Sequence, residues 1–206
     1  MLTAVTAVDN AVWAVGHDQV IISSADGGLT WTLQHSNTAA DGPLLDVMFL
    51  DAQRGFAIGA YGQFLATSDA GANWTLQLIS DRVVADAASA VAKQAAAAES
   101  AEDSGLASTD VGEDEGDPHL NAIVRTSAGL LILGEAGATY RSTDDGSTWV
   151  RGDLPYEGSM FGAVALDTDE VVAFGLRGNA FASKDLGLTW RRLETGTEAS
   201  LLGGAA

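Results

Sequence analysis

Aspartates recur at one place in a repeated pattern, so they are the first residues of this sequence to consider for chemistry. The pattern is S/T-x-D-x-G-x-T/N-W, and it occupies residues 24–31, 67–74, 142–149 and 183–190. Glycoside hydrolysis needs a second carboxylate about 5 to 9 Å away across the sugar. A simpler role is capping, because Asp, Ser and Thr side chains in tight turns accept hydrogen bonds from nearby backbone N–H groups.

The other positions of the pattern favour this structural role. Glycine adopts the positive φ that a tight turn requires, and Thr and Trp suit the start of a strand. The indole also brings a large apolar area that needs burial. We therefore interpret the pattern, called the box below, as a β-hairpin turn with a buried anchor and no reactive centre. Its defining residues are Ser24, Asp26, Gly28 and Trp31; Thr67, Asp69, Gly71 and Trp74; Ser142, Asp144, Gly146 and Trp149; and Ser183, Asp185, Gly187 and Trp190.

Other residues offer little chemistry. The histidines His17, His35 and His119 show no ligand-like spacing. Residues 110–117 superficially suggest a calcium loop, but Gly112 stands where an EF-hand needs Asp or Asn, and the final Glu is missing. No phosphate-binding loop or dinucleotide-binding pattern occurs. We therefore predict no catalytic residue, no metal and no cofactor.

The spacing of the boxes predicts the fold. Asp26 and Asp69 lie 43 residues apart and Asp144 and Asp185 lie 41 apart, whereas the 75 residues from Asp69 to Asp144 equal one period plus an insertion. Such a period suits a four-stranded propeller blade, and short strand patterns between turn residues indicate an all-β chain. We predict one β-propeller domain over residues 1–206, with antiparallel blades at residues 1–37, 43–80, 119–154 and 159–195.

A second repeated turn lies between the second and third strands of each unit. It reads G-x-x-G at residues 59–62, 134–137 and 175–178, and residues 16–19 keep only its first glycine. In an up-and-down blade these turns and the links between blades lie on the face opposite the boxes. Function tends to reside on loops held by a rigid scaffold. We therefore expect this G-x-x-G face to contact a protein partner through His17, Tyr61, Glu135 and Arg177.

Two segments interrupt the repeat. Residues 81–118 form an insertion between the second and third units, with an Ala-rich part of high helix propensity and an acidic part typical of a solvated loop. We expect this insertion to act as a flap or hook on the G-x-x-G face. Residues 199–206 align with the first strand of a further unit, which predicts an orphan strand and an incomplete ring.

Composition narrows the class of partner. The chain has 206 residues, 47% of them hydrophobic, which is typical of a globular protein. A net charge of −18 argues against nucleic acid and anionic lipid as partners. No apolar run approaches the roughly 18 residues of a membrane span, so we expect no membrane insertion. Cysteine is absent, which excludes disulfides, and residues 1–8 show neither the basic region nor the cleavage site of a signal peptide.

The G-x-x-G turn followed by the box resembles the Asp-box, or bacterial neuraminidase, repeat. The unit GFAIGAYGQFLATSDAGANW at residues 55–74 resembles the photosystem II stability and assembly factor family and its relatives in non-photosynthetic bacteria. The resemblance covers the whole chain except residues 81–118. It implies a seven-bladed, non-enzymatic propeller outside the cytoplasm, in the periplasm or thylakoid lumen. It also implies a protein partner, a membrane complex or its assembly intermediates, in photosystem assembly or membrane transport.

Two other functions stay open. Sialidases and some glucanases carry the same boxes, which makes a glycoside hydrolase one alternative. However, the chain lacks the arginine triad and the early Arg-Ile-Pro by which sialidases resemble one another. The other alternative is an incomplete propeller that self-associates, because blade faces are apolar and an open arc leaves two of them bare.

Overall fold

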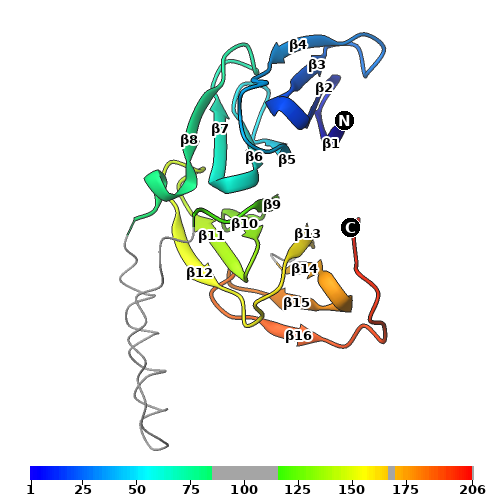
Figure 1. Ribbon diagram of the computed structural model, residues 1–206, viewed down its shortest axis with the longest axis vertical. Helices are drawn as coiled ribbons and strands as arrows, with labels where there is room; N and C mark the ends of the chain where they lie inside the picture. The colour runs from blue at the N-terminus through cyan, green and yellow to red at the C-terminus, as the bar shows by residue number, and fades with distance from the viewer. Residues whose placement is uncertain (85–115, 167–169, 206) are drawn as a thin grey trace, which may run out of the picture.

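The protein folds into four antiparallel sheets of four strands each. The computed structural model describes residues 1–84, 116–166 and 170–205, and the structural statements below refer to these residues. Within each sheet the strands follow chain order, each pairing with the next one along the chain. The predicted all-β fold of four-stranded propeller blades is therefore confirmed (Figure 1).

Each blade corresponds to one unit of the sequence repeat. Blade 1 consists of β1 (Leu2–Val8), β2 (Ala11–Gly16), β3 (Ile21–Ser24) and β4 (Thr32–His35). Blade 2 consists of β5 (Leu44–Phe49), β6 (Gly55–Gly59), β7 (Gln63–Thr67) and β8 (Thr75–Leu78). Blade 3 consists of β9 (Leu120–Arg125), β10 (Leu130–Gly134), β11 (Ala138–Ser142) and β12 (Val150–Asp153). Blade 4 consists of β13 (Met160–Ala165), β14 (Val171–Gly175), β15 (Ala180–Ser183) and β16 (Arg191–Leu193).

The blades are arranged as an arc around their first strands. β1 lies beside β5, β5 beside β9, and β9 beside β13. Figure 1 shows blade 1 at one end of the arc and blade 4 at the other, with both chain termini on the same side. Blades 2 and 3 are consequently covered on both faces by neighbours, whereas each end blade has one neighbour within this chain.

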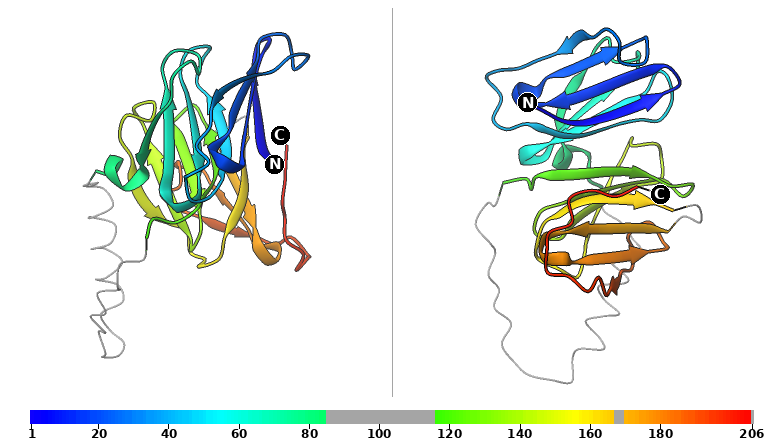
Figure 2. Two further views of the ribbon diagram at one scale, coloured as in Figure 1. Left: turned by 45° about the horizontal axis from the view of Figure 1, so that its top comes forward. Right: turned by 90° about the vertical axis from the view of Figure 1, so that its right-hand side faces the viewer.

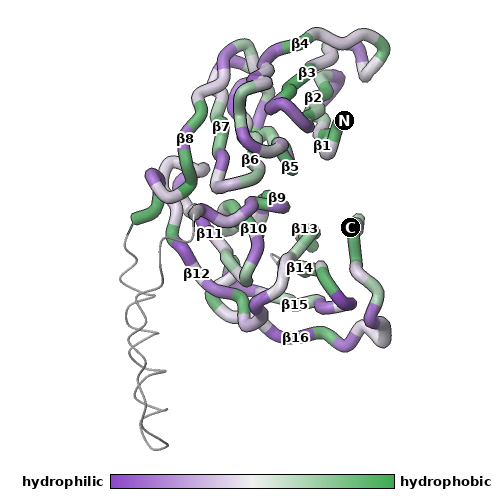
Figure 3. Tube along the Cα trace, in the orientation of Figure 1, coloured by the Kyte–Doolittle hydropathy of each residue, from purple (hydrophilic) through white to green (hydrophobic). Residues whose placement is uncertain are grey.

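Hydrophobic clusters fill the three spaces between blades, as expected from strands whose side chains alternate between two faces. Trp13, Val15 and Phe49 are among the residues that fill the space between blades 1 and 2. Phe64, Ile132 and Trp149 belong to the cluster between blades 2 and 3. Leu131, Leu133 and Phe181 belong to the cluster between blades 3 and 4. Hydrophilic residues gather at turns and on outer strands such as β12 and β16 (Figure 3).

The G-x-x-G turns are tight turns, three of them with a short 3-10 segment: η1 (His17–Gln19), η2 (Ala60–Gly62) and η4 (Leu176–Gly178). Their third residue is left-handed, with φ of 58° at Asp18, 54° at Tyr61, 51° at Ala136 and 56° at Arg177. The final glycine is left-handed too, and Gln19 takes its place in blade 1 at φ 49°. The four residues predicted to meet a partner therefore occupy two positions: His17 and Glu135 are second in their turns, and Tyr61 and Arg177 are third.

The orphan strand predicted at residues 199–206 does not form, since residues 199–205 have no strand structure. The N–H of Leu201 donates to the carbonyl of Gly175 over 2.9 Å. Gly204 lies against the ring of Phe174, and Figure 2 shows this final segment running alongside blade 4. A strand requires a ladder of such bonds to a partner. The segment instead covers part of the end face of blade 4.

The predicted insertion at residues 81–118 falls largely on residues 85–115, which lie outside the described residues. Only its two ends, up to Val84 and from Gly116, are described. Within the described part of the chain, no helix has the length and apolar character needed to cross a membrane.

Candidate functional site

The four boxes share one hydrogen-bonded geometry. In blade 1, Ser24 Oγ donates to Asp26 Oδ1 over 2.7 Å, and the Thr30 N–H donates to the same oxygen over 2.8 Å. Thr30 Oγ1 donates to Asp26 Oδ2 over 2.7 Å, and the Gly28 N–H donates to Ser24 Oγ over 2.8 Å. The other boxes repeat this pattern, with Asn73 Nδ2 in place of a hydroxyl in blade 2.

These contacts occupy the box carboxylates and keep them ionised. Hydrogen bonds from the Thr30 backbone and the Ser24 hydroxyl lower the pKa of Asp26 to about 2. The pKa of Asp69 is lowered chiefly by the Asn73 side chain. Burial acts to raise the pKa of Asp144, but the hydrogen bonds from Thr148 and Ser142 outweigh it and lower the value. Anions held in this way close a turn and are poorly placed to act as bases or nucleophiles.

The box tryptophans pack against the preceding blade wherever one exists. Trp149 of blade 3 is fully buried and meets Phe64 of blade 2 edge-on, with centroids 5.7 Å apart. Trp74 meets Phe49 edge-on at 5.9 Å in the space between blades 1 and 2, and Trp190 packs on the cluster between blades 3 and 4. Trp31 of blade 1 has no preceding blade in this chain and is 42% exposed. The expectation that every indole is buried is therefore wrong for Trp31.

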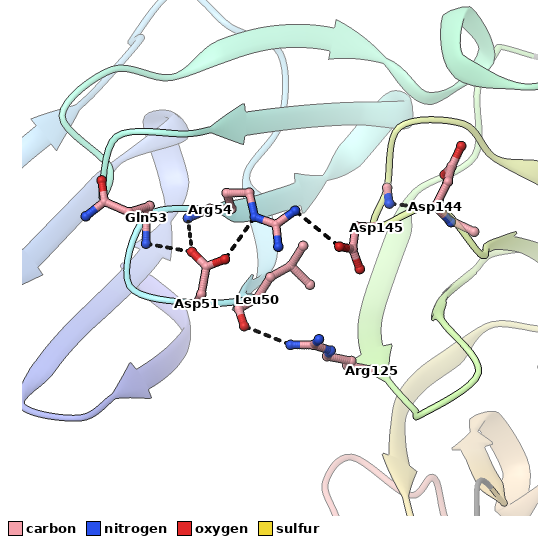
Figure 4. Close-up of polar contacts among 9 residues, drawn as sticks. Leu50, Asp51, Gln53, Arg54, Arg125, Asp144 and Asp145 are labelled. Atoms are coloured by element: carbon pink, nitrogen blue, oxygen red, sulfur yellow. Dashed lines mark hydrogen bonds and ion pairs between the residues drawn. The ribbon is translucent and has the colours of Figure 1, made fainter.

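An ion-pair network connects blades 2 and 3 on the box face. Arg54 Nε lies 2.9 Å from Asp51 Oδ2 and its Nη1 lies 3.2 Å from Oδ2 of Asp145, a residue within the box of blade 3 (Figure 4). Arg125 Nη1 donates to the Leu50 carbonyl over 2.7 Å. The hydrogen bond from Arg54 lowers the pKa of Asp51 to about 2. These charged groups connect the two blades at the surface.

A largely buried carboxylate lies at the same junction, among the first strands of the blades. Asp46 Oδ2 accepts from the Ile123 N–H of blade 3 over 2.9 Å, and Oδ1 accepts from the Val47 N–H over 2.8 Å. Burial raises its pKa to about 6, against the lowering effect of these two hydrogen bonds. Sequence reasoning did not single out Asp46, because one Asp within an apolar strand gives no local signal of burial. No cluster of His, Asp and Glu suited to a metal ion occurs among the described residues.

The G-x-x-G face brings together two of the four residues predicted to contact a partner. The ring of Tyr61 meets His119 edge-on at 4.7 Å, and His119 Nδ1 lies 3.5 Å from Glu135 Oε1. The Glu135 N–H also donates to the His119 carbonyl over 3.1 Å. Tyr61 and Glu135 thus form one cluster through His119, which sequence reasoning set aside because its spacing to other histidines suggested nothing. The position of His119 in the link before β9, on the face that carries the G-x-x-G turns, is the sequence signal that could have indicated this role.

His17 and Arg177 belong to the turns of blades 1 and 4, the two blades at the ends of the arc (Figure 1). His17 is exposed. Arg177 is exposed and borders two open hollows of about 870 and 730 Å³. The structure therefore divides the predicted partner residues among three places on one face.

The two described ends of the insertion attach at different places. The Ser80 hydroxyl donates to Asp117 Oδ2 over 2.7 Å, and the Gly62 N–H donates to the Pro118 carbonyl over 2.9 Å, on the G-x-x-G face. By contrast, the Val84 N–H donates to the Trp149 carbonyl over 2.8 Å, beside the box of blade 3. The returning end of the insertion therefore lies on the G-x-x-G face, and the leaving end lies beside the box of blade 3.

The repeated turns, boxes and radial sheets define the class of protein as an Asp-box β-propeller. Residues 1–68 match the family model described as photosynthesis system II assembly factor YCF48. The resemblance stated from the sequence is therefore confirmed over these residues, and solved YCF48 structures share the β-propeller fold. No curated protein matches the chain.

Solved structures share the fold. A structure described as YCF48 bound to D1 peptide superposes with a TM-score of 0.60 at 18% identity, covering 93% of this chain and 54% of the other. YCF48 from Cyanidioschyzon merolae gives 0.56 at 12% identity, covering 95% and 57%. An ancestral GH74 enzyme gives 0.64 at 12% identity, covering 93% of this chain and 24% of the enzyme. This chain thus spans about half the length of the two YCF48 structures and a quarter of the enzyme.

Proposed function

We propose that this chain is a non-catalytic propeller that binds a protein partner during assembly of a photosystem. The match of residues 1–68 to the YCF48 family supports this proposal most directly. The matched segment includes the turns of blades 1 and 2, with His17 and Tyr61 on the G-x-x-G face. The YCF48 structure bound to a D1 peptide suggests a photosystem II polypeptide as the class of partner.

The proposed contact is the cluster of Tyr61, His119 and Glu135. Tyr61 is 54% exposed, and its ring contacts His119, which in turn lies 3.5 Å from the Glu135 carboxylate. An amphipathic aromatic ring of this kind supplies contact area at low entropic cost, and a carboxylate favours a neutral or basic partner segment. The net charge of −18 favours the same partners.

A binding titration tests this function. Fluorescent peptides that tile the D1 sequence are titrated into the protein and followed by anisotropy. We expect saturable binding to at least one peptide, weakened about tenfold or more when Tyr61→Ala and Glu135→Gln are combined, as for the loss of a binding hot spot. Leu29→Ser is the matched control, because Leu29 is exposed in the box of blade 1 on the opposite face. No binding to any peptide, or equal loss in the control, would contradict the proposal.

The compartment and the wider role follow from the family resemblance. We propose a location outside the cytoplasm, in the periplasm or thylakoid lumen. In an organism without photosystems the partner would be another membrane complex, such as transport machinery. Cross-linking in cells, followed by fractionation and mass spectrometry, tests both points. Recovery of cytoplasmic partners alone would contradict them.

Glycoside hydrolysis is the competing function because the GH74 enzyme shares the fold. The likeness shows the fold alone, and the box carboxylates are already held by hydrogen bonds within their turns. Incubation with chromogenic glycosides distinguishes the two functions. Turnover that survives purification and disappears with a carboxylate variant would overturn the non-catalytic proposal.

Self-association is a further property that we propose for this chain. Val5, Trp31 and Leu33 are 65%, 42% and 59% exposed on the free face of blade 1. Exposed apolar patches of this kind mark association surfaces. Sedimentation velocity at increasing concentration should show a dimer or larger species, and Leu33→Ser combined with Val5→Ser should reduce it. A monomer at all concentrations would rule this property out.

A further inference from the structure

A groove between blades 1 and 2 contains buried polar atoms without partners. It has a volume of about 510 Å³ and opens on the G-x-x-G face. Gln19 of blade 1 and Gln63 of blade 2 line it, and they are 1% and 7% exposed. Both polar atoms of the Gln19 side chain and Oε1 of Gln63 lack a hydrogen-bond partner among the described residues. Buried polar groups are normally paired, so these three atoms call for an explanation.

The backbone conformation of Gln19 is also unfavourable for a residue other than glycine. It is left-handed, with φ 49°, at the position where the other three turns have Gly62, Gly137 and Gly178. A glycine would remove both the strained backbone and the unpaired amide. Retaining a glutamine there costs stability twice, and strain of this kind is commonly found at ligand sites.

The groove also has an apolar side and an acidic residue at its rim. Leu76, Leu78 and Tyr61 line it and are 46%, 42% and 54% exposed. The exposed Asp41 lies at the rim, and its carbonyl accepts from Gln63 Nε2 over 2.5 Å. An anion would meet the Asp41 charge and could not donate a hydrogen bond to the two free glutamine oxygens. A neutral amide both donates and accepts.

We propose that this groove binds an extended, neutral or basic peptide segment of the partner. A peptide carbonyl accepts from Gln19 Nε2, and peptide N–H groups donate to the free oxygens of Gln19 and Gln63. An apolar side chain of the segment packs on Leu76, Leu78 and Tyr61. The inference rests on the proposed binding function, and it names the chemistry that the site recognises.

Small model compounds test the chemistry independently of any protein partner. The probes are N-acetyl-leucine methylamide and the carboxylate N-acetyl-leucine, titrated into ¹⁵N-labelled protein. We expect the methylamide to shift the side-chain NH₂ signals of Gln19 and Gln63 in a saturable manner, and the carboxylate to leave them unchanged. Equal shifts with both probes, or none with either, mean that the groove holds water only, and they overturn the inference.

A glycine variant tests whether Gln19 both lowers the stability of the protein and binds the probe. Gln19→Gly should unfold at a higher urea concentration than the wild type, because it restores the residue found in the other turns, and it should lose the methylamide response. Ala136→Gly is the matched control, since Ala136 is left-handed in the turn of blade 3 away from the groove. It should also be stabilised while keeping the response. A response that persists in Gln19→Gly contradicts the site.

A second pair of variants tests the apolar wall. Leu76→Ser should weaken the methylamide response severalfold, whereas Leu33→Ser should not, because Leu33 is the corresponding outer-strand residue of blade 1 and lies outside the groove.

Failure of every D1 peptide to bind, together with an intact methylamide response, contradicts the proposed partner but not the groove as a binding site. D1 peptide binding that is unchanged in Gln19→Gly places the partner elsewhere and overturns the groove.

Discussion

Blades 1 and 3 have the same box and bury it differently. Around Asp26 and Asp144 the hydrogen bonds agree to within 0.1 Å, at 2.7 and 2.7 Å from the Ser hydroxyl and 2.8 and 2.9 Å from the Thr N–H. Yet Trp31 is 42% exposed and Trp149 is fully buried. The box turn therefore forms from local contacts alone, and the burial of its indole depends on the neighbouring blade.

The indole N–H groups show whether burial of the ring or a hydrogen bond from its nitrogen contributes more to stability. Trp31 Nε1 donates to the Gly28 carbonyl of its own turn over 3.0 Å. The indole nitrogens of Trp74, Trp149 and Trp190 have no partner among the described residues. Burying an indole is worth about 4 to 6 kcal/mol, whereas an unpaired N–H costs about 1–3 kcal/mol. Packing between blades outweighs the lost hydrogen bond.

The cross-strand rows extend this comparison to the whole blade. In blade 3, Ile123, Ile132 and Tyr140 lie side by side across the sheet and are almost completely buried against blade 2. In blade 1, Val5 and Leu33 stand at the ends of the corresponding row and are mostly exposed. Blade 1 therefore presents apolar side chains on a face that no other blade of this chain covers.

The largest expected effect comes from the two tryptophans. Trp149→Ala should reduce the free energy of unfolding by about 3–5 kcal/mol, because it opens a cavity between blades 2 and 3. Trp31→Ala should cost less than about 1 kcal/mol, as for a surface residue. Urea unfolding of both variants measures the difference. Equal losses would mean that the indoles stabilise their own turns and not the contacts between blades.

The contact between the first strands of blades 2 and 3 should contribute a pH-dependent stability, and the contact between those of blades 1 and 2 should not. The pKa of Asp46 is raised to about 6, from 3.8. The folded state therefore binds the proton more tightly, and stability from this group falls by about 2–3 kcal/mol as pH rises from 4 to 7. The junction of blades 1 and 2 instead has Thr3 Oγ1 donating to the Leu44 carbonyl over 2.7 Å, which does not titrate.

Unfolding at pH 4.5 and 7.5 checks this difference. The wild type and Thr3→Val should both show the gain at pH 4.5, whereas Asp46→Asn should lose it. The box aspartates do not interfere, because their lowered pKa values confine their loss of stability to pH values below about 4. A wild type and an Asp46→Asn variant with the same pH profile would contradict the assignment.

The box carboxylate should contribute less than its indole in blade 3. Asp144→Ala removes three hydrogen bonds within the turn, and we expect a loss of about 1–3 kcal/mol. Asp26→Ala should change stability in the same direction in blade 1, since the turn is the same. Thermal unfolding of the two variants checks this, and a loss confined to blade 3 would show that the box depends on neighbouring blades.

The smallest effect should come from the ion pairs of the box face. Arg54 and Asp145 are both about half exposed, and exposed pairs contribute little and are screened by salt. Arg54→Ala should lower the melting temperature only slightly at low salt and not at all at high salt. A large, salt-independent loss would indicate that the pair determines how blades 2 and 3 are joined.

Sequence patterns predict local features of this molecule well and relations between blades poorly. The boxes, the G-x-x-G turns and the four sheets follow from turn chemistry and a period of about 42 residues. The exposure of Trp31 and the burial of Asp46 could not be predicted, because both depend on which blade lies alongside.

The candidate site shows the same division. Variable turn positions in the sequence predict Tyr61 and Glu135 as partner residues, but only the fold brings His119 between them. The sequence does not predict Gln19 as a binding residue, because an unpaired amide and a left-handed backbone are visible only in three dimensions.

Hydrogen–deuterium exchange with and without a bound partner peptide tests the central claim most directly, namely that the boxes join strands while the opposite face binds the partner. Binding should protect amides at residues 17–19, 61–63 and 117–119 and leave residues 26–30 and 144–148 unchanged. Protection confined to the box residues would contradict it.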